Sequence, residues 1–403
     1  MSNYLAKNTL PHVGTTPAVR GDGIKFYDAN GKQYYDFSSQ TLNLLLGQCH
    51  PSIVKAIREQ AGRISYASSR FGTDVYFEAV ELLHSIAPNP ESKVNIKMCD
   101  GSDANETAIK TARKYTNKPG IISFYKMHTG QTTQTINIRG YGRDERTLIG
   151  TTDQVYFVNP PKCKDLMDYL DTLEEIEEIA KREKIGGLIL DPLMVNGGLL
   201  VNKNTREYLR AIQTICKNYN MIFILDENQT FGWFPTLFAS KYWDIDPDII
   251  TLGKGLSGGN PLAGVIIKDY LDGVLDYNEA DFTNGGNPLC CAATIATINT
   301  LLNTNFKIME KEKIFTEGFS VIKEKFSNVN VRGIGIIWCL DLSDIESDNN
   351  LTSSIYKVML DRGIFLRQYG NKLIFKPPVI VTEEEIRMVM LKLRKVMEEV
   401  LCN

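Results

Sequence analysis

Short apolar runs rich in β-branched residues alternate, through the middle of the chain, with longer stretches of helical period. Such runs are typical of strands buried in a parallel sheet, and the stretches between them are typical of crossover helices. The predicted strands lie at 94–98, 121–124, 155–158, 186–190, 221–225, 248–252 and 262–267. The predicted helices between them lie at about 74–87, 102–116, 167–183 and 205–218. This alternation predicts an α/β domain.

The two ends of the chain follow other patterns. Residues 20–37 are typical of a hairpin, with Asn30 and Gly31 as turn residues between two aromatic-rich strands. Towards the carboxyl end, helical patterns at 308–326, 350–362 and 382–401 surround short strands at 336–340 and 372–376. Neither end has enough strands to close a core, so we expect both to fold together into a smaller α+β domain. The expected limits are 1–48 and 301–403 for the small domain and 49–300 for the large one.

Charge and cysteine usage narrow the class of protein. The chain has 45 basic and 48 acidic side chains, which gives no electrostatic reason to expect a nucleic-acid or membrane partner. Its first residues, MSNYLAKNTLPHVG, lack the pattern of a secretion signal, and no window reaches the roughly 18 apolar residues of a membrane span. The cysteines show no CxxC pair, which favours reduced thiols and a soluble cytoplasmic protein. They are Cys49, Cys99, Cys163, Cys216, Cys290, Cys291, Cys339 and Cys402.

The strongest local signal is an acid and a lysine that each follow a predicted strand. Asp226 ends the run MIFIL, and Lys254 lies in the glycine-rich segment TLGKGLSGGNP. Ligands of open α/β sheets bind where strands end, so both side chains can face one crevice. A lysine in a dry crevice loses proton affinity and becomes a nucleophile able to form a Schiff base. The alternatives are a capping aspartate and a solvated loop lysine.

A second candidate site begins at Gly101 and Ser102, in DGSDANETAIKTARKY. These residues lie between a predicted strand and a predicted helix, so unpaired backbone N–H groups at the helix start can bind phosphate. An ordinary helix cap explains the same residues. Lysine, aspartate and phosphate-binding helix start are together what pyridoxal phosphate (PLP) needs. No metal-ligand motif competes, because His12, His50, His84 and His128 are scattered and no HExxH occurs.

The chain resembles the class III aminotransferases, which are PLP enzymes of fold type I. The resemblance spans nearly the whole chain and rests on the order and spacing of many segments, of which no single one is specific. The segments are GDGIKFYDANGKQYYDF, GQCHPSIVKAI, GSDANETAIKTAR, SFYKMHTGQT, LILDP, ILDENQTFG, LFASKYWDIDPDIITLGKGLSGGNPLAGVI, NGGNPLCCAATIATI, VRGIGII and KPPVIVTEEEI. The resemblance implies a mostly parallel seven-stranded sheet flanked by helices, with a smaller α+β domain formed by both ends.

The resemblance also implies roles for individual residues. Lys254 binds the cofactor aldehyde and later moves a proton, while Asp226 pairs with the pyridinium nitrogen. Further cofactor contacts are expected from Gly101, Ser102, His128, Asp191, Gln229 and Thr283. Gly101 and Ser102 would hold the phosphate, and Gln229 would bind the ring hydroxyl. Thr283 would reach the phosphate of a second subunit, so the expected functional unit is a homodimer with active sites at the subunit interface.

Several positions depart from the family pattern. Asp191 replaces a glutamate near the cofactor, and His128 replaces an aromatic residue that stacks on the ring, where it either stacks or handles a proton. An arginine that often binds the substrate α-carboxylate is replaced by Ile374, and Lys376 and Arg367 are the candidates to take its place. The loop after Asp226 is one residue shorter. There Trp233 and Phe234 either rebuild the loop over the site or pack in the core.

These features predict a ping-pong aminotransferase that moves an amino group between an amine or amino acid donor and a carbonyl acceptor. Because the arginine is absent, we expect at least one substrate without a conventional α-amino-acid head, such as an ω-amine, diamine or amino sugar. The main alternative is a PLP-dependent isomerase of the same fold, either an aminomutase or a racemase, which needs no second carbonyl substrate. A noncatalytic scaffold is more remote, and GIGIIW at 333–338 lacks the third glycine of a nicotinamide site.

Overall fold

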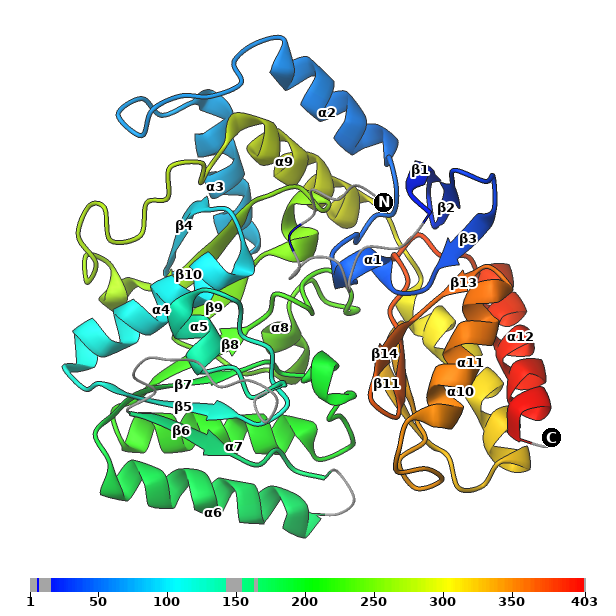
Figure 1. Cartoon of the computed structure of the whole chain (residues 1–403). Helices are drawn as coiled ribbons and strands as arrows, with labels where there is room; N and C mark the ends of the chain where they lie inside the picture. The colour runs from blue at the N-terminus through cyan, green and yellow to red at the C-terminus, as the bar shows by residue number, and fades with distance from the viewer. Residues whose placement is uncertain (1–5, 7–15, 143–153, 163–165, 402–403) are drawn as a thin grey trace.

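The computed structural model describes residues 6, 16–142, 154–162 and 166–401. His12, Cys163 and Cys402 lie outside these residues. Figure 1 shows two bodies side by side, with a large sheet in one and the carboxyl-terminal helices in the other.

The larger body is built on a seven-stranded sheet in the order β4, β10, β9, β8, β7, β5, β6. The strands are β4 (Ser92–Met98), β5 (Gly120–Phe124), β6 (Val155–Val158), β7 (Ile185–Leu190), β8 (Ile222–Asp226), β9 (Ile249–Leu252) and β10 (Ala263–Lys268). Strand β10 runs antiparallel to both of its neighbours, β4 and β9, while β9, β8, β7, β5 and β6 are paired in parallel. The predicted mostly parallel seven-stranded sheet is therefore confirmed.

Helices connect and cover these strands. They are α2 (Pro51–Ala61), α3 (Asp74–Ile86), α4 (Gly101–Thr116), α5 (Thr133–Asn137), α6 (Leu166–Arg182), α7 (Thr205–Asn218), α8 (Ala239–Trp243) and α9 (Pro288–Asn303). Helix α4 packs across β7, β8, β9 and β10. Its first residue, Gly101, lies against Asn228 and Gly253, just past the carboxyl ends of β8 and β9. The polar residues that cap helices explain where several begin, as with Thr73 before α3, Asp100 before α4 and Asn287 before α9.

The two ends of the chain share one small sheet. Strands β1 (Ala18–Asp22), β2 (Lys25–Asp28) and β3 (Gln33–Asp36) form antiparallel pairs, and β13 (Ile364–Phe365) adds to β3 in parallel. The hairpin predicted around Asn30 and Gly31 is confirmed as β2 and β3. The domain limits at residues 48 and 300 stay predictions.

The remaining carboxyl-terminal elements form a second small sheet with helices beside it, on the right of Figure 1. Its strands are β11 (Asn330–Ile334), β12 (Ile337–Asp341), β14 (Arg367–Tyr369) and β15 (Lys372–Phe375). The helices are α10 (Ile308–Lys325), α11 (Asn350–Asp361) and α12 (Glu383–Leu401), and the short α1 (Ser39–Leu42) follows β3. Among the described helices, none is both long enough and apolar enough to cross a membrane.

Candidate active site

Three parallel strands end side by side, and a polar residue stands at or just after each end. Strand β8 ends at Asp226, Asp191 follows β7, and Gly253 and Lys254 follow β9. Because β9, β8 and β7 are parallel neighbours, their carboxyl ends lie side by side at one edge of the sheet. Open α/β sheets bind ligands at such an edge, and we call this place the crevice. The charges of Asp226 and Asp191 both act on the Lys254 amine. The structure thus places Asp226 and Lys254 in one crevice, where the sequence predicted them.

Lys254 is held in an unusual backbone conformation. It begins the 3-10 turn η3 (Lys254–Ser257) with φ of 45°, a region that non-glycine residues seldom occupy and that is enriched at functional sites. Gly253 passes so close to Asn228 that a Cβ there would lie 2.6 Å from Asn228 Oδ1. Burial lowers the pKa of the Lys254 amine, although the carboxylates around it oppose this effect. A lowered pKa makes the amine a better nucleophile near neutral pH.

Asp226 is buried and held by two asparagines. Its Oδ2 accepts from Asn105 Nδ2 at 2.8 Å, and its Oδ1 accepts from Asn228 Nδ2 at 2.6 Å and from Asn228 N at 3.0 Å. Burial raises the pKa of Asp226, while the Lys254 charge and these donors oppose the rise. A buried carboxylate of this kind is stabilised by a cationic partner. Sequence reasoning missed both asparagines, although Asn105 lies one helical turn after Ser102 on α4.

Gln229 and Asp191 belong to a polar chain beside Asp226. Gln229 Nε2 donates to Asn196 Oδ1 at 2.7 Å and weakly to Asp191 Oδ2 at 3.4 Å, while Gln229 Oε1 has no partner within the described parts of the chain. Asp191 accepts from the backbone N–H groups of Leu193 and Met194, each at 3.0 Å. Burial, followed by the Asp226 charge, raises the pKa of Asp191 to about 7. The shorter side chain thus shapes its own loop as well as facing the site.

The start of helix α4 lies beside the same crevice. Gly101 and Ser102 are half-buried there, and a Cβ at Gly101 would lie 2.5 Å from Asn228 Oδ1. Ser102 Oγ accepts from Gln131 N at 3.2 Å, which ties the helix start to the loop after β5. The N-cap residue Asp100 accepts from Ser102 N at 2.6 Å.

Three aromatic side chains lie next to one another, and the first of them, His128, is close enough to be influenced by the charge of Lys254. The rings of His128 and Tyr141 are 6.3 Å apart, and those of Tyr141 and Tyr369 are 5.5 Å apart. Tyr369 Oη accepts from Asn196 Nδ2 at 3.1 Å and from Arg367 Nε at 3.2 Å. Burial, helped by the charge of Lys254, lowers the pKa of His128 to about 4. His128 is therefore a neutral ring at neutral pH, which favours stacking over a proton-handling role.

Trp233, Phe234 and Lys376 are part of the packed interior. Trp233 and Phe234 are buried, so the structure shows core packing and not a loop laid over the site. Lys376 is fully buried, with Nζ 3.4 Å above the Trp233 ring and donating to Leu42 O at 3.0 Å. Burial, with repulsion from Lys254, holds the pKa of Lys376 well below its usual value. Lys376 is therefore occupied by protein partners.

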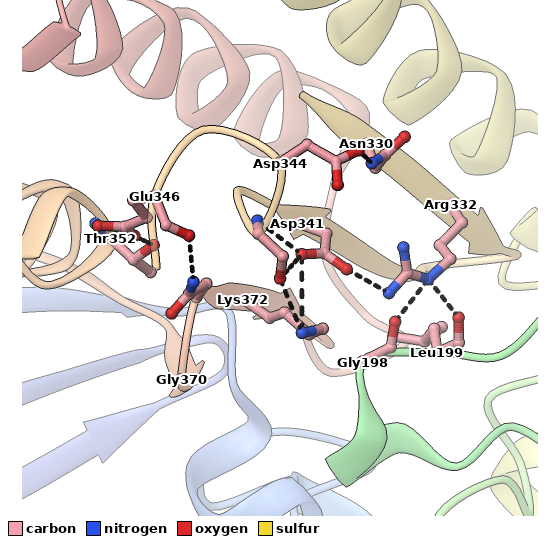
Figure 2. A network of polar contacts seen from close by, with 12 residues as sticks. Gly198, Leu199, Asn330, Arg332, Asp341, Asp344, Glu346, Thr352, Gly370 and Lys372 are labelled. Carbon is pink, nitrogen blue, oxygen red and sulfur yellow. Dashed lines mark hydrogen bonds and ion pairs between the residues drawn. The ribbon is translucent and has the colours of Figure 1, made fainter. Parts of the chain in front are cut away.

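The segment that carries Asn196 is hydrogen-bonded to the second small sheet, formed by β11, β12, β15 and β14. Arg332 of β11 donates through Nε to Gly198 O at 2.7 Å and Leu199 O at 2.5 Å, and Nη2 contacts Asp341 Oδ2 at 2.7 Å (Figure 2). Lys372 adds a second cation 3.6 Å from Asp341 Oδ1. This network joins β11, β12 and β15 to the loop that follows β7.

Thr283 lies apart from the groups above. It is exposed, and its carbonyl oxygen accepts from Tyr66 Oη at 3.0 Å. Within the described ranges, no hydrogen bond joins Thr283 to Lys254, Asp226 or Ser102.

The donors and acceptors of the crevice fit PLP. The buried carboxylate of Asp226 suits a protonated ring nitrogen, the Lys254 amine suits an aldehyde, and the unpaired Gln229 Oε1 suits a ring hydroxyl. The start of α4 offers Gly101 and Ser102 to a phosphate. In the described part of the chain no group of three His, Cys, Asp or Glu side chains could hold a metal ion.

Comparisons with known proteins find one family and several similar chains. The model of the family described as aminotransferase class-III matches residues 6–397. The chain is 32% identical over 391 residues to the acetylornithine aminotransferase of Caldanaerobacter subterraneus, covering 95% of this chain and 94% of that protein. It is 30% identical over 394 residues to the acetylornithine aminotransferase of Methanocaldococcus jannaschii, covering 95% and 93%. The structure of a taurine:2-oxoglutarate aminotransferase from Bifidobacterium kashiwanohense, in complex with PLP and glutamate, is 25% identical with TM-score 0.91, covering 100% and 96%.

Proposed function

Because the chain belongs to the class III aminotransferases, we propose that Lys254 and Asp226 carry its chemistry. The protein is a PLP-dependent aminotransferase that moves an amino group from a donor to a carbonyl acceptor. When bound, the cofactor supplies an aldehyde for the amine and a ring that withdraws electrons. The observation that carries the proposal is the meeting of Lys254 and Asp226 at the ends of neighbouring strands.

We assign each residue of the crevice a task. Lys254 Nζ holds the aldehyde end until the donor amine arrives, and then carries a proton away from the amine-bearing carbon of the donor. Asp226 keeps the ring nitrogen protonated, and its two asparagine donors hold it in place. The further proposed cofactor contacts are Gly101 and Ser102 to the phosphate, Gln229 and Asp191 beside the ring oxygen, and His128 on the ring face.

Substitution of Lys254 tests this assignment. Lys254→Ala removes the amine that forms the covalent link, so we expect loss of the absorbance band of bound PLP near the visible edge. Loss of proton transfer alone lowers turnover by about 10²–10⁴-fold. Lys93→Ala is the control, because Lys93 is an exposed residue paired with Asp269 at 3.2 Å. Unchanged turnover in Lys254→Ala contradicts the proposal, and turnover without any carbonyl acceptor favours an isomerase.

The position and charge of Arg367 lead us to propose a class of substrate. In the register of β14 and β15, Arg367 stands directly opposite Ile374, and directly opposed residues project on the same face. Its charge reaches the Lys254 amine, and no carboxylate pairs with its guanidinium among the described residues. We propose that Arg367 binds an acidic group of the donor, whose transferred amine lies at the other end of the molecule. Acetylornithine and taurine, after which two of the similar aminotransferases are named, have amines placed in this way.

Matched donors test the role of Arg367. Loss of a charge-assisted pair costs about 1.5–3 kcal/mol, so Arg367→Gln is expected to raise KM for an ω-amino carboxylate by about 10–150-fold. The same variant is expected to leave KM for an alkyl amine of equal length unchanged. Arg362→Gln is the control, since Arg362 is paired with Glu399 at the surface. Equal losses for both donors would contradict the assignment, as would a strict preference for α-amino acids.

We propose that the protein forms a homodimer and that an exposed aromatic surface is its interface. Phe71, Tyr277 and Phe77 are 73%, 70% and 55% exposed, and they line one pocket together. Single exposed apolar residues are common, whereas grouped aromatics mark an interaction surface. Thr283 is exposed as well, and Tyr66 contacts its carbonyl oxygen. A second copy covering this surface would let Thr283 reach the partner's cofactor phosphate.

The cellular setting is also a proposal. The described cysteines are free thiols, and we propose a reducing cytoplasm as the compartment. They are Cys49, Cys99, Cys216, Cys290, Cys291 and Cys339. The near balance of 45 basic and 48 acidic residues supports partners that are small molecules, with no nucleic acid or membrane.

A further inference from the structure

An acidic residue occupies the N-cap position of the helix that we assign to the cofactor phosphate. Asp100 precedes Gly101 and Ser102, is exposed, and points its Oδ1 at Ser102 N, 2.6 Å away. Helix α4 runs for 16 residues, so its first N–H groups attract an anion through donors and dipole together. One of those donors is therefore already bonded to a carboxylate of the same chain.

The other acids of this helix start are engaged elsewhere. Asp103 Oδ2 accepts from Cys99 N at 3.0 Å, and Glu106 Oε1 accepts from Gln134 N at 3.1 Å. No cation forms an ion pair with Asp100 among the residues described, although its charge reaches Lys254 and His128. Asp100 is thus the acid of this region whose charge is directed at the crevice.

We propose that Asp100 competes with the cofactor phosphate and weakens the binding of PLP to this enzyme. The inference rests on the proposed function, because it takes Ser102 and Gly101 as the phosphate site. A phosphate at the start of α4 must take the Ser102 N–H from Asp100, and the displaced carboxylate stays next to a dianion. The cofactor is consequently released and exchanged with solution faster than it would be without this charge.

Titration of the apoenzyme with two aldehydes isolates the contribution of the phosphate group to cofactor binding. Dissociation constants for PLP and for pyridoxal, which lacks the phosphate, are measured by absorbance and by fluorescence for the full chain and its variants. Asp100→Asn removes the charge and keeps a side-chain acceptor for the helix cap, because asparagine and aspartate cap equally well. Asp100→Ser is the second variant, with a shorter acceptor. Asp103→Asn removes a charge from the same helix turn and serves as the control.

We expect Asp100→Asn and Asp100→Ser to bind PLP about fivefold to thirtyfold more tightly, the range for one like charge in a partly exposed site. Pyridoxal binding is expected to change less than twofold, and Asp103→Asn is expected to resemble the unaltered protein. Unchanged or weaker PLP binding in both Asp100 variants overturns the inference, as does equal tightening for pyridoxal. Thermal unfolding of each apoenzyme verifies the fold.

If the unaltered protein forms no borohydride-fixed adduct at Lys254, the proposed function falls and this inference with it. If that adduct forms and the Asp100 variants behave like the unaltered protein, only this inference falls.

Discussion

Asp226 and Lys254 shift each other's pKa because both are buried away from water. Burial alone disfavours the charged form of each, and the opposite charge of the other partly offsets that effect. Asn105 and Asn228 add donors to the carboxylate, so Asp226 can stay ionised without a solvent shell. At the scale of single residues, the site therefore holds two buried groups of opposite charge, and the charge of each depends on the other and on the polar neighbours of Asp226.

The titration of His128 provides a test at the same scale. Its pKa is lowered to about 4, so the His128 ring stays neutral between about pH 5.5 and 9. We expect His128→Phe to keep the shape of the pH profile of kcat/KM over that range, because phenylalanine preserves the ring face. A steady-state profile at half-unit intervals measures this. The disappearance of an ionisation from the profile of His128→Phe would show that the imidazole handles a proton.

At the scale of elements, the site depends on a loop that is fixed from outside the large sheet. The loop after β7 carries Asn196, which accepts from Gln229, and Arg332 of β11 holds the backbone of this loop (Figure 2). Burial tends to raise the pKa of Asp341, but Ser343, Arg332 and Lys372 keep it below its usual value. The contribution of this ion pair to folding is therefore complete above about pH 4 and is lost as the pH falls further.

Replacement of Arg332 tests this coupling between elements. Arg332→Met leaves Asp341 without its closest cation and the carbonyl groups of Gly198 and Leu199 without their donor, so we expect unfolding free energy to fall by about 1–3 kcal/mol. Hydrogen exchange at residues 193–200 is expected to accelerate, with a higher KM for the donor. Arg387→Met is the control, because Arg387 pairs with Glu317 at the surface. Unchanged exchange in this loop would show that Arg332 does not hold it.

At the scale of the molecule, residues far apart in the chain meet around the crevice. The parallel pairing of β3 with β13 joins the two ends, and the paired strands β14 and β15 bring Arg367 towards Lys254. The exposed aromatic surface of Phe71, Phe77 and Tyr277 lies on the large body and has no covering segment within the described chain. The proposed second copy would bury it.

A charge placed in that surface tests the assembly. Phe71→Asp puts an ion where we expect an apolar interface, and loss of one buried aromatic anchor costs about 2–4 kcal/mol of association. We expect light scattering to show the mass of a monomer at micromolar concentration, together with weaker PLP binding, because Thr283 no longer reaches the partner's site. Leu391→Asp, at an exposed leucine of α12, is the control. A Phe71→Asp protein that remains dimeric would place the interface elsewhere.

Much of the fold follows from local patterns, as the predicted strands and helices of the large body show. Strand β8 was expected at 221–225 and lies at Ile222–Asp226, and the helix expected at 205–218 is α7 (Thr205–Asn218). The pairing of β13 with β3 did not follow, because a strand of two residues has no periodicity to detect. Asn196 and Arg332 were also missed, since their roles depend on contacts between segments distant in sequence.

The sequence by itself determined the alternation of strands and helices, and with it the crevice where Asp226 and Lys254 follow their strands. Those features depend on burial periods and on neighbours within a few residues, which any local window contains. Only the tertiary structure decided between the two interpretations of Trp233, and it favours Arg367 over Lys376 as the replacement for the missing arginine. Lys376 lies over Trp233 with its amine bonded to Leu42, whereas Arg367 has no carboxylate partner among the described residues. Such distinctions depend on which groups desolvate and pair with one another, and that is settled only when the whole chain has packed.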